Sequence, residues 1–281
     1  MATPRLARID IFPIKALDGV SVDRVRISSV GTLIMDREFG LMDTNRHWIN
    51  GKRSTAIHRV RATFNLDQRT VTLGIQDHSD QATFSLDHGR DRLMTWVGRY
   101  LQQSVQLRHC QEGSFTDDLR ASGPTIISTA TLETVAEWYP HVSVEELRRR
   151  FRTNLEIDGV PPFWEDRLYG PPDQFQPFSI GPVPFLGYYP CQRCIVPTRN
   201  SLTGEGDRRF QKILSKRREE TLPEWANREQ FRHFFRLAVN TKIPTPTDEL
   251  WLTVGDRLTF PSAQSESSDS SESPIPDNSE D

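Results

Sequence analysis

The sequence predicts a mostly β (α+β) fold, and three observations lead to this prediction. Short stretches that alternate apolar and polar residues recur through the first 110 residues, as half-buried strands do. Asp-Gly, Val-Gly and Leu-Gly pairs interrupt these stretches at intervals typical of turns between antiparallel strands. Stretches with the helical spacing of apolar residues are short and lie between the strand patterns.

The first 110 residues are predicted to form an antiparallel sheet or barrel. The strands that the alternation indicates are 8–15, 20–27, 38–43, 62–66, 70–75 and 81–86. Residues 91–102 place Leu93, Trp96 and Val97 at helical spacing, which predicts a short helix. Residues 103–110 return to a strand pattern.

Two helices are predicted in the middle of the chain, after a strand at 125–128. Thr131 is expected to cap the first of them. Ser143, followed three residues later by Glu146, forms a capping box that opens the second helix, 145–150. The arginines at the end of this helix are expected to form a solvated face.

A strand is then predicted over 151–157, with Arg152 and Asn154 on one face of the sheet because side chains alternate along a strand. Further along, 179–188 is a predicted strand. Asp207 is expected to cap a helix that ends near residue 218. Residues 237–243 and 250–260 are predicted to form a closing hairpin.

Composition divides the chain into a body and a tail. Residues 261–281 carry six acidic residues and no basic one, so the formal net charge of −3 for the chain becomes +3 for the rest. We expect this Ser-rich tail to be disordered. The predicted division is an N-terminal domain over 1–110, a second domain over 111–260 and the tail.

The charge, the apolar runs and the cysteine count exclude several classes of function. A body charge this mild gives no argument for nucleic-acid binding. No signal peptide pattern and no apolar run of membrane-spanning length occur, so no membrane partner is expected. Three cysteines argue against a disulfide framework, and a cytoplasmic location is the default expectation.

The segment around Cys191 and Cys194 is the strongest chemical signal. It reads Cys-Gln-Arg-Cys, and a neighbouring cation such as Arg193 favours the thiolate, which is the nucleophilic and metal-binding form of cysteine. Because the chain has only one further cysteine, a structural zinc site is not expected. A redox dithiol, a sulfur carrier and a single thiolate ligand to a softer metal centre all remain open.

Basic and polar side chains recur at the ends of predicted strands. Lys15, Arg37, Arg152 and Asn154 stand at such ends, and Arg193 lies beside Cys194. Lysine and arginine recognise phosphate groups. If the strand ends converge, they form a basic pocket beside a thiolate, although each of these residues could equally be an ordinary surface or sheet-face residue.

Several short motifs in order resemble the MOSC-domain family, which is named for the C-terminal domain of molybdenum cofactor sulfurases. Within it, the chain is most similar to the mitochondrial amidoxime-reducing component and its bacterial relatives. The likeness covers about residues 5–260. The motifs are Ile-Phe-Pro-Ile-Lys at 11–15, Asp-Arg at 36–37, Ile-Ser-Thr-Ala-Thr-Leu at 127–132, Phe-Arg-Thr-Asn at 151–154, Glu-Asp at 165–166, Ile-Gly at 180–181, Cys-Gln-Arg-Cys at 191–194, Thr-Gly at 203–204 and Val-Gly-Asp at 254–256.

The resemblance implies an N-terminal β-barrel-like domain, a MOSC β-barrel with a few peripheral helices, and a molybdenum cofactor, Mo-molybdopterin. It implies that Cys194 ligates the metal and acts as the catalytic residue. The positions that it implies for cofactor binding are Lys15, Ala16, Arg37, Ser122, Arg152, Asn154, Gln192, Arg193 and Cys194. The family usually has serine where this chain has Ala16, and Ser122 lies in a poorly matching stretch.

The implied activity is the two-electron reduction of small N-hydroxylated or N-oxygenated compounds. No flavin or nucleotide motif occurs, so a separate reductase is expected to donate the electrons. Two alternatives stay open: a sulfur carrier or sulfurtransferase with a persulfide on Cys194, and a non-catalytic cofactor-binding module. The chain is too short to hold a pyridoxal-phosphate desulfurase domain as well, so another protein would supply the sulfur.

Other reactive residues are expected to be structural. Cys110 stands alone, and Cys191 is as compatible with a structural role as with a second functional thiol. Glu165 and Asp166 are predicted to pair with Arg167 or to close a turn. The seven histidines, including His58, form no cluster with metal-ligand spacing.

Overall fold

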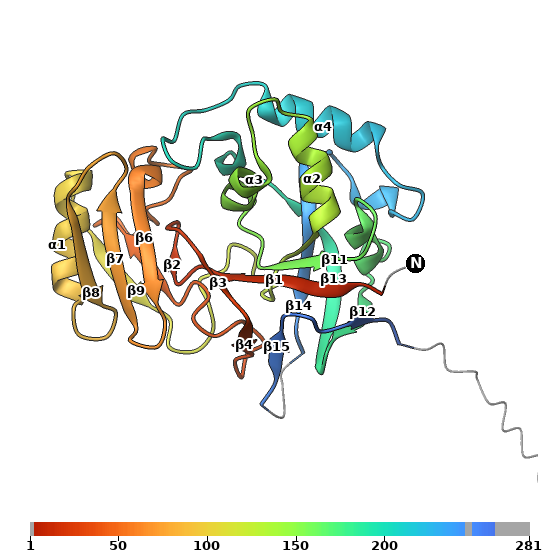
Figure 1. Cartoon of the computed structure of the whole chain (residues 1–281), viewed down its shortest axis with the longest axis horizontal. Helices are drawn as coiled ribbons and strands as arrows, with labels where there is room; N and C mark the ends of the chain where they lie inside the picture. The colour runs from red at the N-terminus through yellow and green to blue at the C-terminus, as the bar shows by residue number, and fades with distance from the viewer. Residues whose placement is uncertain (1–2, 245–248, 262–281) are drawn as a thin grey trace, which may run out of the picture.

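The computed structural model describes residues 3–244 and 249–261, and these residues form the predicted mostly β fold (Figure 1). The predicted disorder of the tail concerns residues that lie, Pro261 apart, outside this part of the chain. No helix in the described residues has the length and apolar character needed to cross a bilayer.

An eight-stranded sheet joins the two halves of the chain. Its strands, in spatial order, are β16 (Leu258–Thr259), β12 (Gln176–Ile180), β13 (Val183–Gln192), β14 (Arg236–Lys242), β10 (Ile126–Ser128), β11 (Leu155–Asp158), β1 (Arg5–Ile11) and β3 (Val20–Val22). Only β10 and β11 pair in parallel; the other neighbours within this sheet are antiparallel. The predicted domain boundary at residue 110 stays a prediction, and β1 and β3 pair within this larger sheet.

Smaller sheets complete the N-terminal part. One contains β2 (Ile14–Lys15), β5 (Phe39–Met42) and β9 (Gln106–His109), and another contains β6 (Val60–Asn65), β7 (Thr70–Ile75) and β8 (Gln81–Ser85). A two-stranded sheet pairs β4 (Arg24–Arg26) with β15 (Trp251–Thr253). Figure 1 shows the β6–β7–β8 sheet and α1 (Arg90–Leu101) at one end of the molecule.

The helices α2 (Thr129–Glu137), α3 (Val144–Phe151) and α4 (Phe210–Glu220) lie on one side of the large sheet (Figure 1). Their apolar side chains, with Ile127, Leu237 and Ala238 of the sheet, form one hydrophobic cluster. Short 3₁₀ helices stand in the connections: η1 (Ala56–Arg59), η2 (Trp164–Leu168), η3 (Val196–Thr198) and η4 (Arg228–Gln230). Two further hydrophobic clusters form the core: one contains mainly residues of the large sheet, and the other lies within the N-terminal part.

The predicted strand over 151–157 is wrong at its start. Phe151 is the last residue of α3, because it continues the buried helix face formed by Leu147. Arg152 then caps the helix in the left-handed conformation, with φ of 53°. The strand β11 begins only at Leu155, so Arg152 and Asn154 do not share a sheet face.

The predicted closing hairpin is also wrong. The strand β14 pairs with β13 and β10, β15 pairs with β4, and β16 pairs with β12. Alternation of apolar and polar residues identifies a strand but does not specify its partner.

Some predicted boundaries shift for local reasons. The stretches 8–15 and 20–27 each contain two strands, and the first is divided near Pro13, which has no N–H for a ladder. Ser128, not Thr131, caps α2, since its Oγ accepts the Thr131 N–H at 3.1 Å. Arg209, not Asp207, is the N-cap position of α4. The predicted cap of α3 is confirmed, because Ser143 Oγ accepts from Glu146 N–H at 3.1 Å.

A buried ion pair connects α4 to the 3₁₀ helix η2. The Arg218 guanidinium donates to the Asp166 carboxylate, and both side chains are almost fully buried. The partner of Asp166 is therefore Arg218 rather than the predicted Arg167. Glu165 beside it accepts from Thr131 Oγ1 at 3.0 Å, and burial together with the charge of Asp166 raises the pKa of Glu165 to about 7.

We expect Arg218→Met to lower the free energy of unfolding by about 3 kcal/mol or more, because it leaves the Asp166 charge buried without a partner. Urea unfolding of the variant and the wild type measures the difference. Lys216→Met, on the exposed side of the same helix, should change stability by less than about 0.5 kcal/mol. A loss for Arg218→Met no larger than that of the control contradicts the prediction.

Candidate functional site

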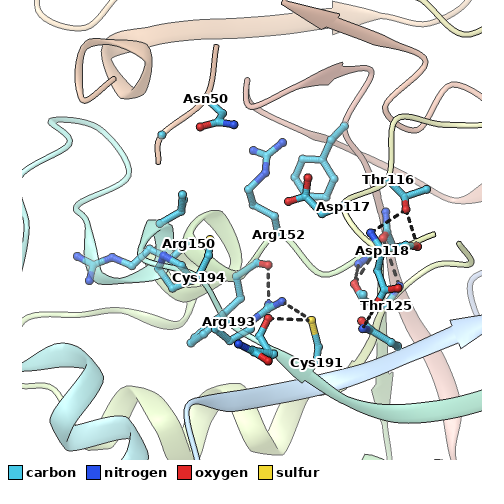
Figure 2. A pocket seen from close by; sticks show the side chains of 18 of the residues that line it. Asn50, Thr116, Asp117, Asp118, Thr125, Arg150, Arg152, Cys191, Arg193 and Cys194 are labelled. Carbon is cyan, nitrogen blue, oxygen red and sulfur yellow. Dashed lines mark hydrogen bonds between the residues drawn. The ribbon is translucent and has the colours of Figure 1, made fainter. Parts of the chain in front are cut away.

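A cavity of about 940 Å³ opens where the N-terminal part meets the end of the large sheet. It is lined from β2, the loop 116–125, the end of α3, the cysteine segment after β13, and β14. Figure 2 shows side chains from the loop 116–125, from the end of α3 and from the cysteine segment around it. The predicted site residues that line it are Lys15, Ala16, Arg37, Arg152, Asn154, Gln192, Arg193 and Cys194.

Ser122 is the predicted site residue that does not line the cavity, although its neighbours Ala121 and Gly123 do. The backbone holds this segment tightly: a Cβ on Gly123 would lie 2.8 Å from the Thr241 carbonyl oxygen. The structure therefore brings together eight of the nine predicted positions from four separate segments of the chain.

Phe12 packs against two arginines at one wall of the cavity. The guanidinium carbon of Arg152 lies 4.2 Å from the centre of the Phe12 ring, and that of Arg37 lies 5.1 Å from it. Arg37 also donates to the Arg152 carbonyl at 3.2 Å and to Asn154 Oδ1 at 3.3 Å. These contacts fix both guanidinium groups at the cavity wall.

Three of the predicted residues have left-handed backbone: Ala16 with φ of 74°, Arg37 with φ of 52° and Arg152 with φ of 53°. Residues with a Cβ rarely adopt this conformation, and its cost is of order 1 kcal/mol or more. At each of these three positions the chain turns sharply beside a strand or at the end of a helix. The turns direct the three side chains into the same cavity, which straight strands would not do.

Lys15 is fixed at another part of the wall. Its Nζ donates to the Phe115 carbonyl at 2.8 Å and to Asp117 Oδ1 at 2.5 Å. Asp117 also accepts from Lys52 Nζ at 3.3 Å. Burial lowers the pKa of Lys15 despite the charge of Asp117.

The two thiols of the cysteine segment have different surroundings. Cys194 is exposed, whereas Cys191 is half-buried, and Arg193 Nη1 donates to its sulfur at 3.0 Å. Arg193 Nη2 donates to the Phe151 carbonyl at 2.6 Å, which fixes the guanidinium between the segment and α3 (Figure 2). The cation predicted to assist Cys194 therefore contacts Cys191 in this structure.

Positive charge exceeds negative charge in the cavity lining. Twelve lysines and arginines face five carboxylates there. Several of the arginines carry a buried N–H that has no acceptor among the described residues: Arg150 Nη1, Arg152 Nη2, Arg193 Nε, Arg199 Nε and Arg236 Nε. Buried donors in native proteins are nearly always paired, so these N–H groups indicate a site for an anionic ligand.

Burial, and after it the charge of neighbouring arginines, lowers the pKa of two residues of the lining. Burial and the nearby charge of Arg37 lower the pKa of Arg152 to about 10. Burial and the charge of Arg199 lower the pKa of His58. An anion in the cavity would oppose both effects, because an opposite charge favours the protonated form of each group.

Sequence reasoning missed Arg150 and His58. Arg150 was assigned to a solvated helix face, but it is 7% exposed, lines the cavity and pairs with Glu146 at 2.7 Å. A signal was available in the sequence. Arg150 follows Leu147 by three residues and directly precedes Phe151, which places it on the buried face of α3. For His58, which the histidine spacing gave no reason to select, no sequence signal was present.

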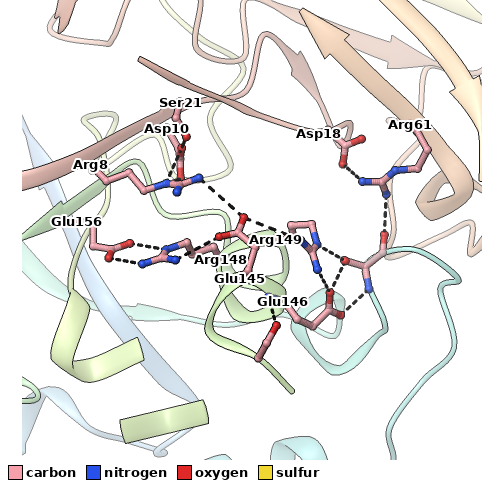
Figure 3. Close-up of polar contacts among 12 residues, drawn as sticks. Arg8, Asp10, Asp18, Ser21, Arg61, Glu145, Glu146, Arg148, Arg149 and Glu156 are labelled. Carbon is pink, nitrogen blue, oxygen red and sulfur yellow. Dashed lines mark hydrogen bonds and ion pairs between the residues drawn. The ribbon is translucent and has the colours of Figure 1, made fainter. Parts of the chain in front are cut away.

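The Glu146 carboxylate holds the loop that follows the cysteine segment (Figure 3). It accepts from Ser201 N at 2.9 Å and from Ser201 Oγ at 2.5 Å, and it pairs with Arg149 and Arg150. The same loop meets the N-terminal part closely at Gly204, where a Cβ would lie 2.6 Å from the Thr55 carbonyl oxygen. This contact explains why the Thr-Gly motif requires glycine.

The fold and the cavity define a mostly β protein with a basic cavity beside a pair of thiols. The family model of the MOSC N-terminal beta barrel domain matches residues 3–119. The match covers the N-terminal part of the chain, and together with the relatives below it supports a MOSC-domain protein.

The curated relatives include molybdenum cofactor sulfurases from Drosophila erecta and Caenorhabditis elegans. The first is 25% identical over 283 residues, which are 88% of this chain and 33% of the relative. The second is 25% identical over 225 residues, which are 73% of this chain and 30% of the relative. The chain thus spans about a third of the length of these relatives.

Among solved structures, the YUAD protein from Bacillus subtilis aligns with 91% of this chain and 94% of its own, at 11% identity and a TM-score of 0.36. This likeness is too weak to carry an argument. Among residues 3–244 and 249–261, no group of three or more His, Cys, Asp or Glu side chains is arranged to hold a metal ion.

We expect Glu146→Gln to lower the free energy of unfolding by about 1 to 3 kcal/mol at pH 7, because the charged hydrogen bonds to Ser201 and the arginines weaken. Burial alone raises the pKa of Glu146, but the Ser201 hydrogen bonds and the Arg150 charge outweigh it and lower the pKa overall. A lowered folded pKa gives stability that is present above the ordinary value of 4.5 and is lost as the pH falls through the folded pKa.

Urea unfolding between pH 3 and pH 7 therefore tests the role of Glu146. The stability difference between wild type and Glu146→Gln should be largest above pH 4.5 and should shrink below it. Glu205→Gln, an exposed change in the same loop, serves as the control and should show little difference at any pH. A Glu146→Gln difference that stays constant with pH would argue against the charge as the cause.

Proposed function

We propose that this chain is a molybdenum-cofactor-binding oxidoreductase that reduces N-hydroxylated or N-oxygenated compounds. The observation that carries the proposal is the set of unpaired, buried arginine N–H groups that line a cavity together with Cys194. Arginine N–H groups are the preferred partners of phosphate oxygens. They therefore fit a phosphorylated organic cofactor such as Mo-molybdopterin.

The residues present fit each part of such a group. Arg152, Arg193 and Arg236 offer free donors for a phosphate. Cys194 is exposed in the same cavity, so its sulfur is accessible as a single thiolate ligand to molybdenum. Asn154 is 3% exposed and is fixed by its Nδ2 donating to the Asp10 carbonyl at 3.1 Å, so it supports the wall rather than moving with the ligand.

When bound, molybdenum would supply the two-electron chemistry, and the chain would bind, orient and enclose the cofactor. Reduction of an N-hydroxyl group consumes two electrons and two protons and yields the N–H compound and water. A separate reductase would supply the electrons. Lys15 and Arg37, each fixed by hydrogen bonds, would hold the cofactor in one orientation while Cys194 binds the metal.

The named relatives favour a second candidate, a sulfur carrier. They are molybdenum cofactor sulfurases, and the chain matches about a third of their length. In this candidate, Cys194 would carry a persulfide that another protein supplies. Cyanide-labile sulfur on metal-free, freshly purified protein would favour the carrier, and stoichiometric molybdenum without such sulfur would favour the oxidoreductase.

Replacement of the proposed ligand tests the metal site. Expressed in a host that makes the molybdenum cofactor, wild type should contain close to one molybdenum per chain, and Cys194→Ala should lose most of it. Mass spectrometry of the metal content measures both. Cys110→Ala is the matched control, because Cys110 is half-buried outside the cavity lining. A well-folded wild type without molybdenum overturns the proposal.

The arginine donors are tested separately. Arg152→Gln should lower the affinity for the cofactor about tenfold or more, since a hydrogen bond to a charged group contributes about 1.5 to 3 kcal/mol. The readout is pterin and molybdenum retained after dialysis, with the unfolding midpoint measured alongside. Arg208→Gln, an exposed change outside the lining, should retain both. Equal retention by Arg152→Gln would show that the phosphate lies elsewhere.

A further inference from the structure

The sulfur of Cys191 contacts one arginine of the cavity lining, and a second arginine of the lining stands on the neighbouring strand. Arg193 Nη1 contacts it at 3.0 Å. Arg236, opposite Gln192 in the β13–β14 register, donates to the Pro190 carbonyl at 3.0 Å and keeps a buried Nε without an acceptor. By contrast, the Cys110 thiol lies outside the cavity and donates to the Glu112 carbonyl at 3.2 Å.

A second, independent observation indicates an anion in the cavity that this thiol lines. Arg150 is 7% exposed and lines the same cavity, yet its Nη1 has no partner in the described part of the chain. The cavity of about 940 Å³ admits a small molecule, and its excess of lysine and arginine would raise the local concentration of anionic ones. Cys191 is half-buried, so its sulfur remains accessible from the cavity.

From this geometry we infer that Cys191 is a modification site for small disulfides that carry carboxylate groups. The thiolate of Cys191 attacks one sulfur of the disulfide, the S–S bond breaks as the new one forms, and the other half leaves as a thiolate. The Cys191 sulfur is oxidised from the thiol to the disulfide level, and the leaving sulfur is reduced from the disulfide to the thiol level. The incoming disulfide is therefore the oxidant.

The cavity acts on this exchange in two ways. Its cations attract the carboxylates before reaction, and Arg193 and Arg236 stabilise the negative charge that develops on the leaving sulfur. The inference does not rest on the proposed function, because it concerns the chain without cofactor. It is specific to Cys191 and leaves the role of Cys194 open.

The test uses the full chain with the substitution Cys194→Ser, expressed in a host that cannot make the cofactor. The substitution removes the neighbouring thiol, which could otherwise attack the mixed disulfide on Cys191. The probes are 3,3′-dithiodipropionate, which carries two carboxylates, and cystamine, which carries two ammonium groups. Peptide mass spectrometry follows modification of Cys191, with Cys110 as the internal reference. At low salt, the carboxylate probe should modify Cys191 about tenfold faster than it modifies Cys110.

The same experiment on variants tests whether Arg193 causes the faster modification of Cys191. Arg193→Gln should lower the Cys191 rate with the carboxylate probe several-fold, Arg193→Lys should retain part of it, and Arg208→Gln should leave it unchanged. High salt should reduce the preference, since screening weakens attraction between charges. An unchanged Cys110 rate verifies the fold. Equal rates of the two probes at Cys191, or a Cys191 rate no higher than that of Cys110, would overturn the inference.

Discussion

The site depends on buried positive charge that the protein itself neutralises only in part. Charged groups lose hydration when they are buried, and a buried donor without an acceptor costs free energy comparable to a lost hydrogen bond. This chain places five such arginine N–H groups around one cavity. Elsewhere, Arg218 pairs with the buried Asp166 carboxylate, although its Nε and Nη1 also have no acceptor among the described residues. What distinguishes the five cavity arginines is that they line one cavity together, where a ligand could reach them.

The rest of the architecture serves to bring these arginines together. They come from α3 and its cap, from the cysteine segment, from the cap of η3 and from β14. Left-handed backbone at Arg37 and Arg152 turns two of the segments toward the cavity. Register shifts between Gly187 and Tyr189 and between Pro190 and Gln192 bend the end of β13 just before the cysteines. The Glu146 carboxylate then secures the loop beyond them.

Much of the site could be predicted from short motifs, and much of its geometry could not. Lys15, Arg37, Arg152 and Asn154 were selected by resemblance and do meet at one cavity. Strand reasoning about Arg152 failed, since a left-handed cap and a strand start look alike in a stretch of four residues. Arg150 was missed because a run of arginines normally indicates solvent. Strand partners, and hence the hairpin, depend on contacts that no local pattern encodes.

The distinction between the two thiols has the most direct consequence for chemistry. The motif alone places Arg193 next to Cys194 in sequence, which suggested that this cation serves Cys194. In the fold, the end of β13 directs the guanidinium back to Cys191, two residues earlier, while Cys194 stays exposed. A metal ligand needs accessibility and a free lone pair, whereas a thiol that exchanges with anionic disulfides needs neighbouring cations. In the two roles that we propose, separate sulfurs three residues apart would meet these requirements.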